Sequence, residues 1–267
     1  MQGLHFPLPR STAALIEQYG KRPGPRDNVS LWLDKLIPRR PGSWSLTASD
    51  RSDALDLGGQ RQSVAGQAGV QRLRRTVAAL HPGGLHQGFV LATLGRLLVD
   101  YGRASAVETS ASLQPIWGVP RIPGSALKGV TRAAAAREGF GQARLEDLFG
   151  ETTQAGRLVF YDAYPVDGRF ELALDVLTPH FADYYQGHEA PSETLSPIPF
   201  TFLTVVQTQF QLLLGVERRP GEGPQVLPRL EKDVREVSEL LRRVLAEDGV
   251  GAKTSAGYGR FKEALGR

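Results

Sequence analysis

The sequence predicts an α+β fold in which strands and helices follow the order β-α-β-β-α-β, the ferredoxin-like (RRM-like) order, with insertions and an N-terminal helical extension. Three observations predict it. An alanine-rich stretch of helical composition, residues 125–137, follows a first apolar segment. Runs rich in Val, Leu, Phe and Thr come next, as is typical of strands. A long amphipathic segment and a short apolar run then supply a second helix and a last strand.

Composition bounds the class of protein. The 267 residues, 41% of them hydrophobic, can bury a sizeable core. The absence of cysteine excludes disulfides and thiolate metal sites, and the net charge of +4 is compatible with an anionic partner. No apolar run approaches the roughly 18 residues of a membrane span. We therefore expect a cytoplasmic protein that uses no cofactor, no metal and no membrane.

Residues 1–66 form the predicted N-terminal extension, and residues 67–267 the ferredoxin-like domain. Helical composition predicts short helices at Ser11–Tyr19 and Leu31–Ile37. Trp32 and Trp44 indicate that the extension packs on the rest of the protein. The polar, Gly- and Gln-rich stretch Ser49–Gly69 is typical of a linker or mobile loop.

The domain begins with a predicted helix over Gln71–Leu80, whose polar side carries Arg72, Arg74 and Arg75. The later predicted elements are a strand at Leu97–Tyr101, a helix from Ser125 through about Arg137, strands at Arg157–Pro165, Phe170–Leu177 and Phe200–Val216, a helix at Leu230–Leu245 and a strand at Arg260–Lys262. Polar insertions are expected at Ser105–Trp117 and Thr178–Pro199.

The start of the helix predicted from Ser125, within residues 122–132, is suited to phosphate. Ser125 stands where an N-cap belongs, and the opening turn of a helix leaves N–H groups free and carries partial positive charge. Gly124 lets a ligand approach, because it has no Cβ. Lys128 and Arg132 are four residues apart and share one face. The neighbouring sequence offers no acid, thiol or histidine for chemistry on such a ligand.

The glycine-rich stretch Gly249–Gly259 is a second candidate anion site. It holds four glycines, a lysine, two hydroxyls and a tyrosine. Successive N–H groups in such a loop can form an anion nest, to which Lys253 adds charge, while Tyr258 can stack on a base or ribose. A tight turn before an edge strand is the alternative. The presence of two such Gly/Ser/Lys loops in one chain with the ferredoxin-like order of elements favours the binding of an anion.

Other polar residues have simpler explanations. His180 could be combined with Asp162 and Asp175 as a metal cluster, but the spacing matches no standard ligand pattern. A hydrogen-bonded structural histidine is more typical. Glu146 and Asp147 are expected to solvate a helix end.

Together these segments resemble the RAMP superfamily, the ferredoxin-like proteins of CRISPR RNA-guided effector complexes. The matching motifs are at residues 122–129, 148–150 and 251–259. Within the superfamily the chain is most similar to the sixth subunits of the type III-B Cmr complex, through residues 175–185 and 199–205. The resemblance covers about residues 89–262. The superfamily motif often carries a second serine where this chain has Ala126.

The resemblance implies a non-catalytic backbone subunit near the 3′ end of the guide RNA, whose partners are the guide RNA, its duplex with target RNA and the other Cmr subunits. The residues implied to contact RNA are Gly124, Ser125, Ala126, Lys128, Gly129, Arg132, Lys253, Thr254, Ser255, Gly257 and Tyr258. By analogy with the superfamily's thumb hairpin, Ser105–Trp117 would wedge into the guide–target duplex. This interpretation requires Ser125 and Lys253 to face one groove.

Two alternatives stay open. The chain could be a metal-independent RNA endonuclease that uses a histidine such as His180, with a tyrosine and a lysine, for acid–base catalysis. It could also be a protein–protein adaptor whose glycine loops are turns that dock a neighbour.

Overall fold

The computed structural model describes residues 8–19, 23–37, 47, 54–99, 113–177 and 200–264. Two short helices form in the N-terminal extension, α1 (Arg10–Tyr19) and α2 (Val29–Lys35), as predicted. Asn28 caps α2. Trp32 of α2 is buried within the main hydrophobic core, which confirms that the extension packs on the rest of the protein. Trp44 lies outside the described residues.

The central sheet has five antiparallel strands, four of them in the order β10–β2–β9–β5. Their bounds are β2 His86–Thr93, β5 Leu158–Phe160, β9 Gln209–Val216 and β10 Phe261–Glu263. The fifth, β6 (Tyr164–Pro165), also pairs with β9, so the strand predicted over 157–165 is divided in two.

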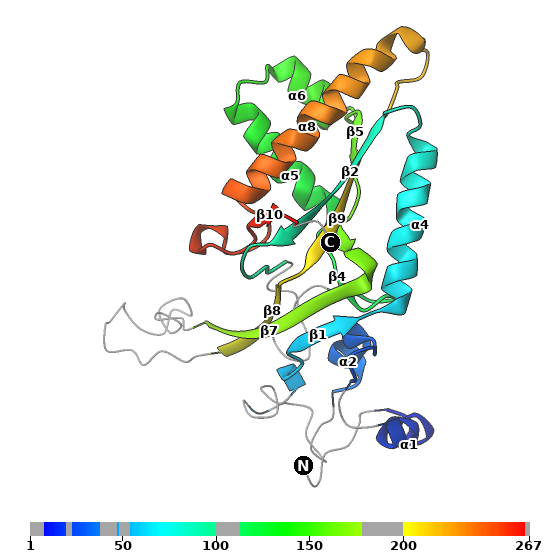
Figure 1. The fold of residues 1–267 in the computed structure, drawn as a ribbon, viewed down its shortest axis with the longest axis vertical. Helices are drawn as coiled ribbons and strands as arrows, with labels where there is room; N and C mark the ends of the chain where they lie inside the picture. The colour runs from blue at the N-terminus through cyan, green and yellow to red at the C-terminus, as the bar shows by residue number, and fades with distance from the viewer. Residues whose placement is uncertain are drawn as a thin grey trace, which may run out of the picture.

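Helices lie on both sides of this sheet. Figure 1 shows α5 (Gly124–Arg137), α6 (Gln142–Phe149) and α8 (Leu227–Glu247) on one side and α4 (Val64–Leu80) on the other. The smaller elements are the hairpin β3 (Leu113–Gln114) and β4 (Val119–Pro120) and the 3₁₀ turns η1 (Val166–Gly168), η2 (Pro224–Val226) and η3 (Thr254–Ala256).

The apolar stripe predicted for the last helix is confirmed. Leu230, Val234, Val237, Leu241 and Val244 of α8 are all buried. They pack against β2, β9 and α5. Burial of this stripe, at spacings of three and four residues, holds α8 on the sheet.

The first strand of the domain lies earlier than predicted. The sequence predicts it over Leu97–Tyr101, whereas β2 ends at Thr93. Phe89, Leu91 and Thr93 alternate toward the buried side of β2, the pattern of a half-buried strand. Leu97 makes only an isolated bridge, and the last two residues of the predicted strand lie outside the described ones. The prediction is wrong because a short apolar run does not distinguish a strand from a buried loop.

A second sheet has the order β1–β7–β8, with β1 at Gly59–Gln62, β7 at Arg169–Leu177 and β8 at Phe200–Val206. The prediction of a linker over Ser49–Gly69 is therefore wrong, because this stretch contains β1 and the start of α4. The Gly-Gln-Arg-Gln sequence of β1 has little strand preference of its own, and its antiparallel pairing with β7 supplies it. The insertion predicted at 178–199 lies outside the described residues.

The long strand predicted over Phe200–Val216 breaks at Gln207, which has a positive φ of 44°. β8 joins the second sheet and β9 the central one. Thr208 links the two sheets: its hydroxyl accepts the Glu171 N–H at 3.0 Å, and its own N–H donates to the Thr93 hydroxyl at 3.1 Å. The chain thus changes sheets within two residues.

A network of ion pairs joins the end of α6 to the start of α8. Nε of Arg157, a buried side chain, lies 2.8 Å from Asp147, and its two terminal nitrogens lie 2.7 and 2.6 Å from Glu222. Asp147 also pairs with Arg219 at 2.9 Å and Arg229 at 2.5 Å. The prediction that Asp147 merely solvates a helix end is wrong, because three arginines converge on it.

This network predicts a loss of stability in acid. Hydrogen bonds from Arg157 hold the pKa of Glu222 at about 2, below its usual 4.5. A carboxyl whose pKa is lowered by folding stabilises the native state above its unfolded pKa, and that contribution disappears as the pH falls through the folded pKa. We therefore expect the urea midpoint to fall between about pH 4.5 and about pH 2, and to fall less for Glu222→Gln. Equal slopes for the two proteins in urea titrations across this window would contradict the expectation.

Candidate nucleic-acid interface

The helix α5 begins earlier than predicted, at Gly124, and Ser125 is not its N-cap. The N-cap is Pro123, with φ −60° and ψ 136°, and no side chain of the cap residue bonds the helix end. Ser125 lies in the first turn and is exposed. The predicted serine cap is therefore wrong, because the proline ring already fixes the backbone angle from which the helix starts.

A carboxylate of the protein itself occupies the start of α5. Asp162 Oδ1 accepts the Gly124 N–H at 2.8 Å, and Oδ2 lies 3.4 Å from a guanidinium nitrogen of Arg121 and 3.3 Å from the Tyr164 hydroxyl. Burial, with the charge of Asp162, raises the pKa of Tyr164 to about 12. The expectation of no acid at this helix end is wrong. Asp162 already uses part of the positive potential that a phosphate would meet there.

Gly124 is required by the protein's own packing. A Cβ at this position would lie 2.9 Å from the carbonyl carbon of Phe160, and nearer still to its oxygen. The start of α5 therefore approaches the chain between β5 and β6 so closely that only a residue without a Cβ fits. The sequence analysis explained Gly124 by the close approach of a ligand. In the structure, it is the backbone of Phe160 and Tyr161 that lies close to Gly124.

The outer face of α5 carries positive charge. Ser125, Gly129 and Arg132 are exposed and Lys128 is half-buried, and spacings of three and four residues align them along one face. We call these four residues the α5 stripe. Within the part of the chain that the structure describes, neither cation of the stripe forms an ion pair. Ala126 packs against the core instead. The stripe is thus open to an anionic partner.

Most backbone N–H groups of the loop Gly249–Gly259 are bonded within the protein. Those of residues 249, 250, 252 and 256–259 donate to carbonyl oxygens of the chain. Two of these bonds hold the loop against the segment that follows β2: Ala252 donates to Leu98 at 2.8 Å and Gly259 donates to Arg96 at 2.7 Å. The predicted anion nest is therefore largely used by the fold.

The outward side of the loop presents side chains. Lys253 has left-handed backbone angles, φ 60° and ψ 32°, and directly precedes η3. Ser255 and Gly257 are exposed, and Lys253 and Thr254 are half-buried. An ammonium group and two hydroxyls suit contacts with phosphate oxygens.

Tyr258, the candidate for base stacking, is tied to β7. Its hydroxyl donates to Asp175, whose carboxylate also lies 3.2 Å from Arg96 Nε. Arg96 donates in turn to the Leu174 carbonyl and to the Thr204 hydroxyl, both at 3.0 Å. Burial, together with the hydrogen bond to Asp175, raises the pKa of Tyr258. The tyrosine therefore anchors the glycine loop to the second sheet.

The α5 stripe and the glycine loop lie at the same end of the central sheet but at opposite edges. α5 follows the bridge between Ile122 and Ala163 beside β6, and the loop leads into β10. Strands β2 and β9 lie between these edges. At the usual spacing of about 4.8 Å between neighbouring strands, the two edge strands β10 and β5 are therefore about 14 Å apart. A ligand that touches both Ser125 and Lys253 must therefore cross this end of the sheet.

The insertion predicted at Ser105–Trp117 is described from Leu113 onward. Its end is fixed to the start of α4, because the Ser63 hydroxyl donates to the Trp117 carbonyl at 2.6 Å. Residues 105–112 and His180 lie outside the described residues. The proposed wedge and the proposed catalytic histidine stay predictions.

The aspartates considered as metal ligands serve separate contacts: Asp162 at the start of α5 and Asp175 beside the glycine loop. Among the described residues, no three histidine or carboxylate side chains gather so that they could hold a metal ion. Within the same ranges, no helix combines the length and apolar character needed to cross a bilayer.

The class of protein follows from comparison with known proteins. The α+β fold with antiparallel sheets is similar to a chain in the cryo-EM structure of the type III-B Cmr-beta bound to cognate target RNA, with a TM-score of 0.63 over 82% of this chain and 76% of that one. At 20% identity this likeness concerns the fold alone. The model of the RAMP superfamily matches residues 90–262. The chain therefore belongs to the RAMP superfamily.

Two relatives make the resemblance more specific, and both are named as the Cmr6 subunit of a CRISPR system. The protein of Pyrococcus furiosus is 30% identical over 239 residues, covering 64% of this chain and 66% of the relative. That of Saccharolobus solfataricus is 29% identical over 175 residues, covering 65% and 52%. The predicted resemblance to the sixth Cmr subunits is confirmed. The matches span about two thirds and about half of these relatives' lengths.

Proposed function

We propose that the chain is a non-catalytic, guide-RNA-binding backbone subunit of a type III-B CRISPR complex that targets RNA, near the 3′ end of the guide. The names of the relatives and the fold shared with a Cmr complex support membership of such a complex. The observation that carries RNA binding is the α5 stripe, where Lys128 and Arg132 have no carboxylate partner among the described residues. Its partners would be guide RNA, the guide–target duplex and other Cmr subunits.

We also propose that the core is ferredoxin-like (RRM-like). In chain order, β2, α5, β5, β9, α8 and β10 follow the β-α-β-β-α-β pattern. The sheet order β10–β2–β9–β5 supports it, because the first and third strands of that pattern lie in the middle. On this interpretation β6, β7 and β8 are insertions between the second and third strands, and α6 follows the first helix.

The two surfaces suit different parts of a phosphate backbone. Lys128 and Arg132 supply charge along α5, and Gly129 leaves open space beside them, since no atom lies within 4 Å of the position its Cβ would take. The loop adds the ammonium of Lys253 and the hydroxyls of Thr254 and Ser255. Such contacts position RNA without reading its sequence, which base pairing with the target supplies.

A non-catalytic role is supported by the state of the acid–base groups near these surfaces. Asp162 bonds the backbone of Gly124, and Asp175 accepts from Tyr258. Tyr164, with its pKa of about 12, stays protonated at neutral pH. These groups are occupied in holding the fold together.

Replacing Lys128 and Lys253 together by alanine is expected to weaken binding of guide RNA and to lower its salt dependence. Each lost contact with single-stranded RNA removes about 0.7 from the slope of log K against log salt, so the double variant should lose about 1.4. Fluorescence anisotropy with labelled guide RNA over a salt series measures both effects.

The matched control replaces Lys35 and Lys232, which are exposed on α2 and α8, by alanine and removes the same charge elsewhere. Its slope should stay close to that of the unaltered protein. An unchanged slope for the Lys128 and Lys253 variant would contradict the proposed RNA site. Specific cleavage of repeat RNA in the presence of a chelator, lost in His180→Ala, would contradict the non-catalytic role.

A further inference from the structure

The face of the central sheet that points away from α5 and α8 is the face on which α4 lies (Figure 1). Two cavities hollow this face, of about 690 and about 740 Å³, and Val90 of β2 lines both. We call the two cavities together the sheet trough. The first lies beside β1 and β7, and the second beside α4.

The second cavity is basic. Arg74 and Arg75 of α4 line it, opposite Gly88 and Gln211 of the sheet. The sequence of α4 contains no acidic residue. Both arginines are exposed, and neither forms an ion pair in the described ranges. No carboxylate is found among the described residues that line this cavity. An anion placed here would meet positive charge alone.

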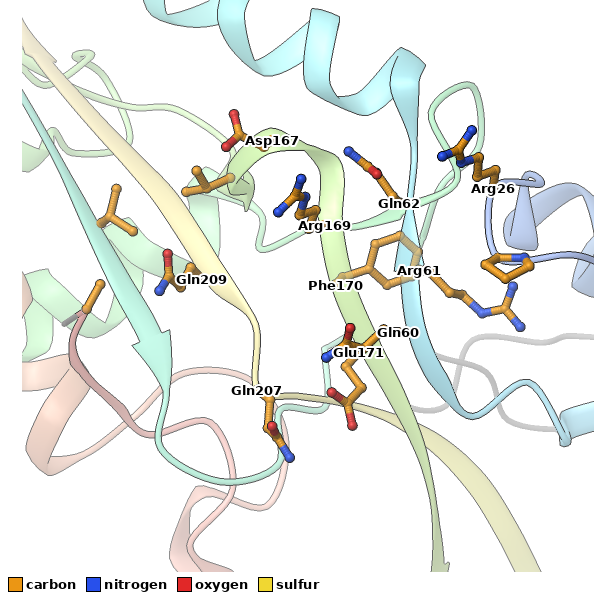
Figure 2. Close-up of a pocket in the computed structure, with 14 residues that line it drawn as sticks. Arg26, Gln60, Arg61, Gln62, Asp167, Arg169, Phe170, Glu171, Gln207 and Gln209 are labelled. Carbon is orange, nitrogen blue, oxygen red and sulfur yellow. The ribbon is translucent and has the colours of Figure 1, made fainter. Parts of the chain in front are cut away.

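Arginine side chains also line the first cavity. Figure 2 shows Arg169 of β7 and Gln209 of β9 among the residues that line it. Arg169 and Arg26 are exposed and have no ion pair in the part of the molecule described. With Arg61, three arginines line the cavity against two carboxylates, those of Asp167 and Glu171.

Arg61 is held in this cavity without a carboxylate on its nitrogens. Its side chain is buried, and its Nε and one terminal nitrogen donate to the carbonyls of Leu57 and Gly24 at 3.1 and 3.0 Å. Burial lowers the pKa of the guanidinium, and the charge of Asp27 only partly opposes this. A bound anion would compensate the charge that the fold leaves under-neutralised.

Among the described residues, the floor of the trough offers no exposed phenylalanine, tyrosine or tryptophan ring for base stacking. It is formed by Gly88, Gln209 and Gln211, and the amide of Gln211 donates to the Phe89 and Leu212 carbonyls. Among the described lining residues, the rings of Phe89 and Phe170 are buried, and that of His86 is half-buried with its Nδ1 2.7 Å from the His81 carbonyl oxygen. Sheets that read single-stranded RNA stack bases on exposed aromatic rings. A ligand of this trough would therefore be held through phosphates and sugars.

We propose that the sheet trough binds a single-stranded segment of RNA through its phosphates, at a site separate from the α5 stripe and the glycine loop. Each cavity has the volume of a pocket for one small ligand, which fits a nucleotide or two. A positively charged groove that follows the backbone is the usual site for a single strand. The inference shares the ligand class of the proposed function but none of its residues.

Replacing Arg74 and Arg75 together by glutamine is expected to weaken binding of a fluorescein-labelled oligouridylate to the full chain on the order of tenfold at about 0.1 M salt. The salt slope should fall by about 1.4, because two phosphate contacts are lost. The matched control replaces Arg72 and Arg218 by glutamine. Both are exposed and lie outside the trough, and Arg72 is on the same helix. Anisotropy titrations should show the control within about twofold of the unaltered protein.

Several outcomes would overturn the proposal: equal losses in the two variants, an unchanged slope in the Arg74 and Arg75 variant, or competition by duplex RNA or polyglutamate as strong as by oligouridylate. A second measurement needs no substitution. Photocrosslinking with a 4-thiouridine oligonucleotide should label peptides of the elements that line the trough, which are β1, β2, α4, β7 and β9, and labelling of other elements alone would also overturn the proposal. Binding lost in the Lys128 and Lys253 variant but intact in the Arg74 and Arg75 variant would overturn the trough and leave the proposed function standing.

Discussion

Replacing Gly124 by alanine is expected to lower the free energy of unfolding by about 3 kcal/mol. The added Cβ would lie 2.9 Å from the Phe160 carbonyl carbon and 3.1 Å from that of Tyr161. Both are backbone atoms, so no change of rotamer relieves the overlap. The start of α5 must move away from β5 and lose the hydrogen bond between the Gly124 N–H and Asp162. Urea unfolding followed by circular dichroism measures the loss.

Gly129→Ala, on the same helix, is the matched control. Its Cβ would meet no atom within 4 Å. Alanine is also a better helix former than glycine by about 1 kcal/mol, so this variant should be more stable than the unaltered protein. If both variants lost similar stability, the close approach at Gly124 would not be the cause.

Arg157→Ala should lower the free energy of unfolding by a similar amount, about 3 kcal/mol. The side chain is only 6% exposed and joins Asp147 to Glu222. Its removal leaves two partly buried carboxylates without their principal partner, which costs more than the pairs themselves contribute. The pKa of Glu222 should rise from about 2 toward its usual 4.5, so the stability of the variant should depend less on pH in this range.

Two variants separate charge from geometry at this position. Arg157→Lys keeps the charge, but a single ammonium group cannot replace the one hydrogen bond to Asp147 and the two to Glu222. We therefore expect an intermediate loss of stability for this variant. Arg218→Ala removes an exposed arginine and should change stability by no more than about 0.5 kcal/mol. A loss of under about 1 kcal/mol for Arg157→Ala would show that the network contributes little.

Helices α5 and α8 could be predicted because their signals are local. The alanine-rich sequence of α5 predicts its end at Arg137, and the stripe of α8 predicts which side faces the sheet. The strands were harder to predict. β1 has no strand-like composition and exists through pairing with β7. The apolar run at Leu97 is buried without forming a strand: Leu97 bonds Val205 of β8, and the glycine loop donates to the carbonyls of Arg96 and Leu98.

The candidate site also has one part that the sequence predicts and one part that only the structure shows. That Lys128 and Arg132 share a face follows from helical geometry and is visible in the sequence. The contact between Asp162 and the start of α5 is not visible in the sequence, because Asp162 and Gly124 lie 38 residues apart and come together next to the bridge between Ile122 and Ala163. The sequence does show an α4 rich in arginine and free of acids, which was the available signal for the trough. It does not show that Gly88 faces those arginines.

By itself, the amino-acid sequence determined the helices α1, α2, α5 and α8, the lack of thiol chemistry and membership of the RAMP superfamily, because these depend on composition, periodicity and motifs of neighbouring residues. Only the tertiary structure decided which glycine-loop amides are already bonded, which carboxylate meets α5 and which groups line the open face of the sheet. These depend on strand register and on where the chain crosses from one sheet to another, and a shift of one residue in register would turn every side chain to the opposite face.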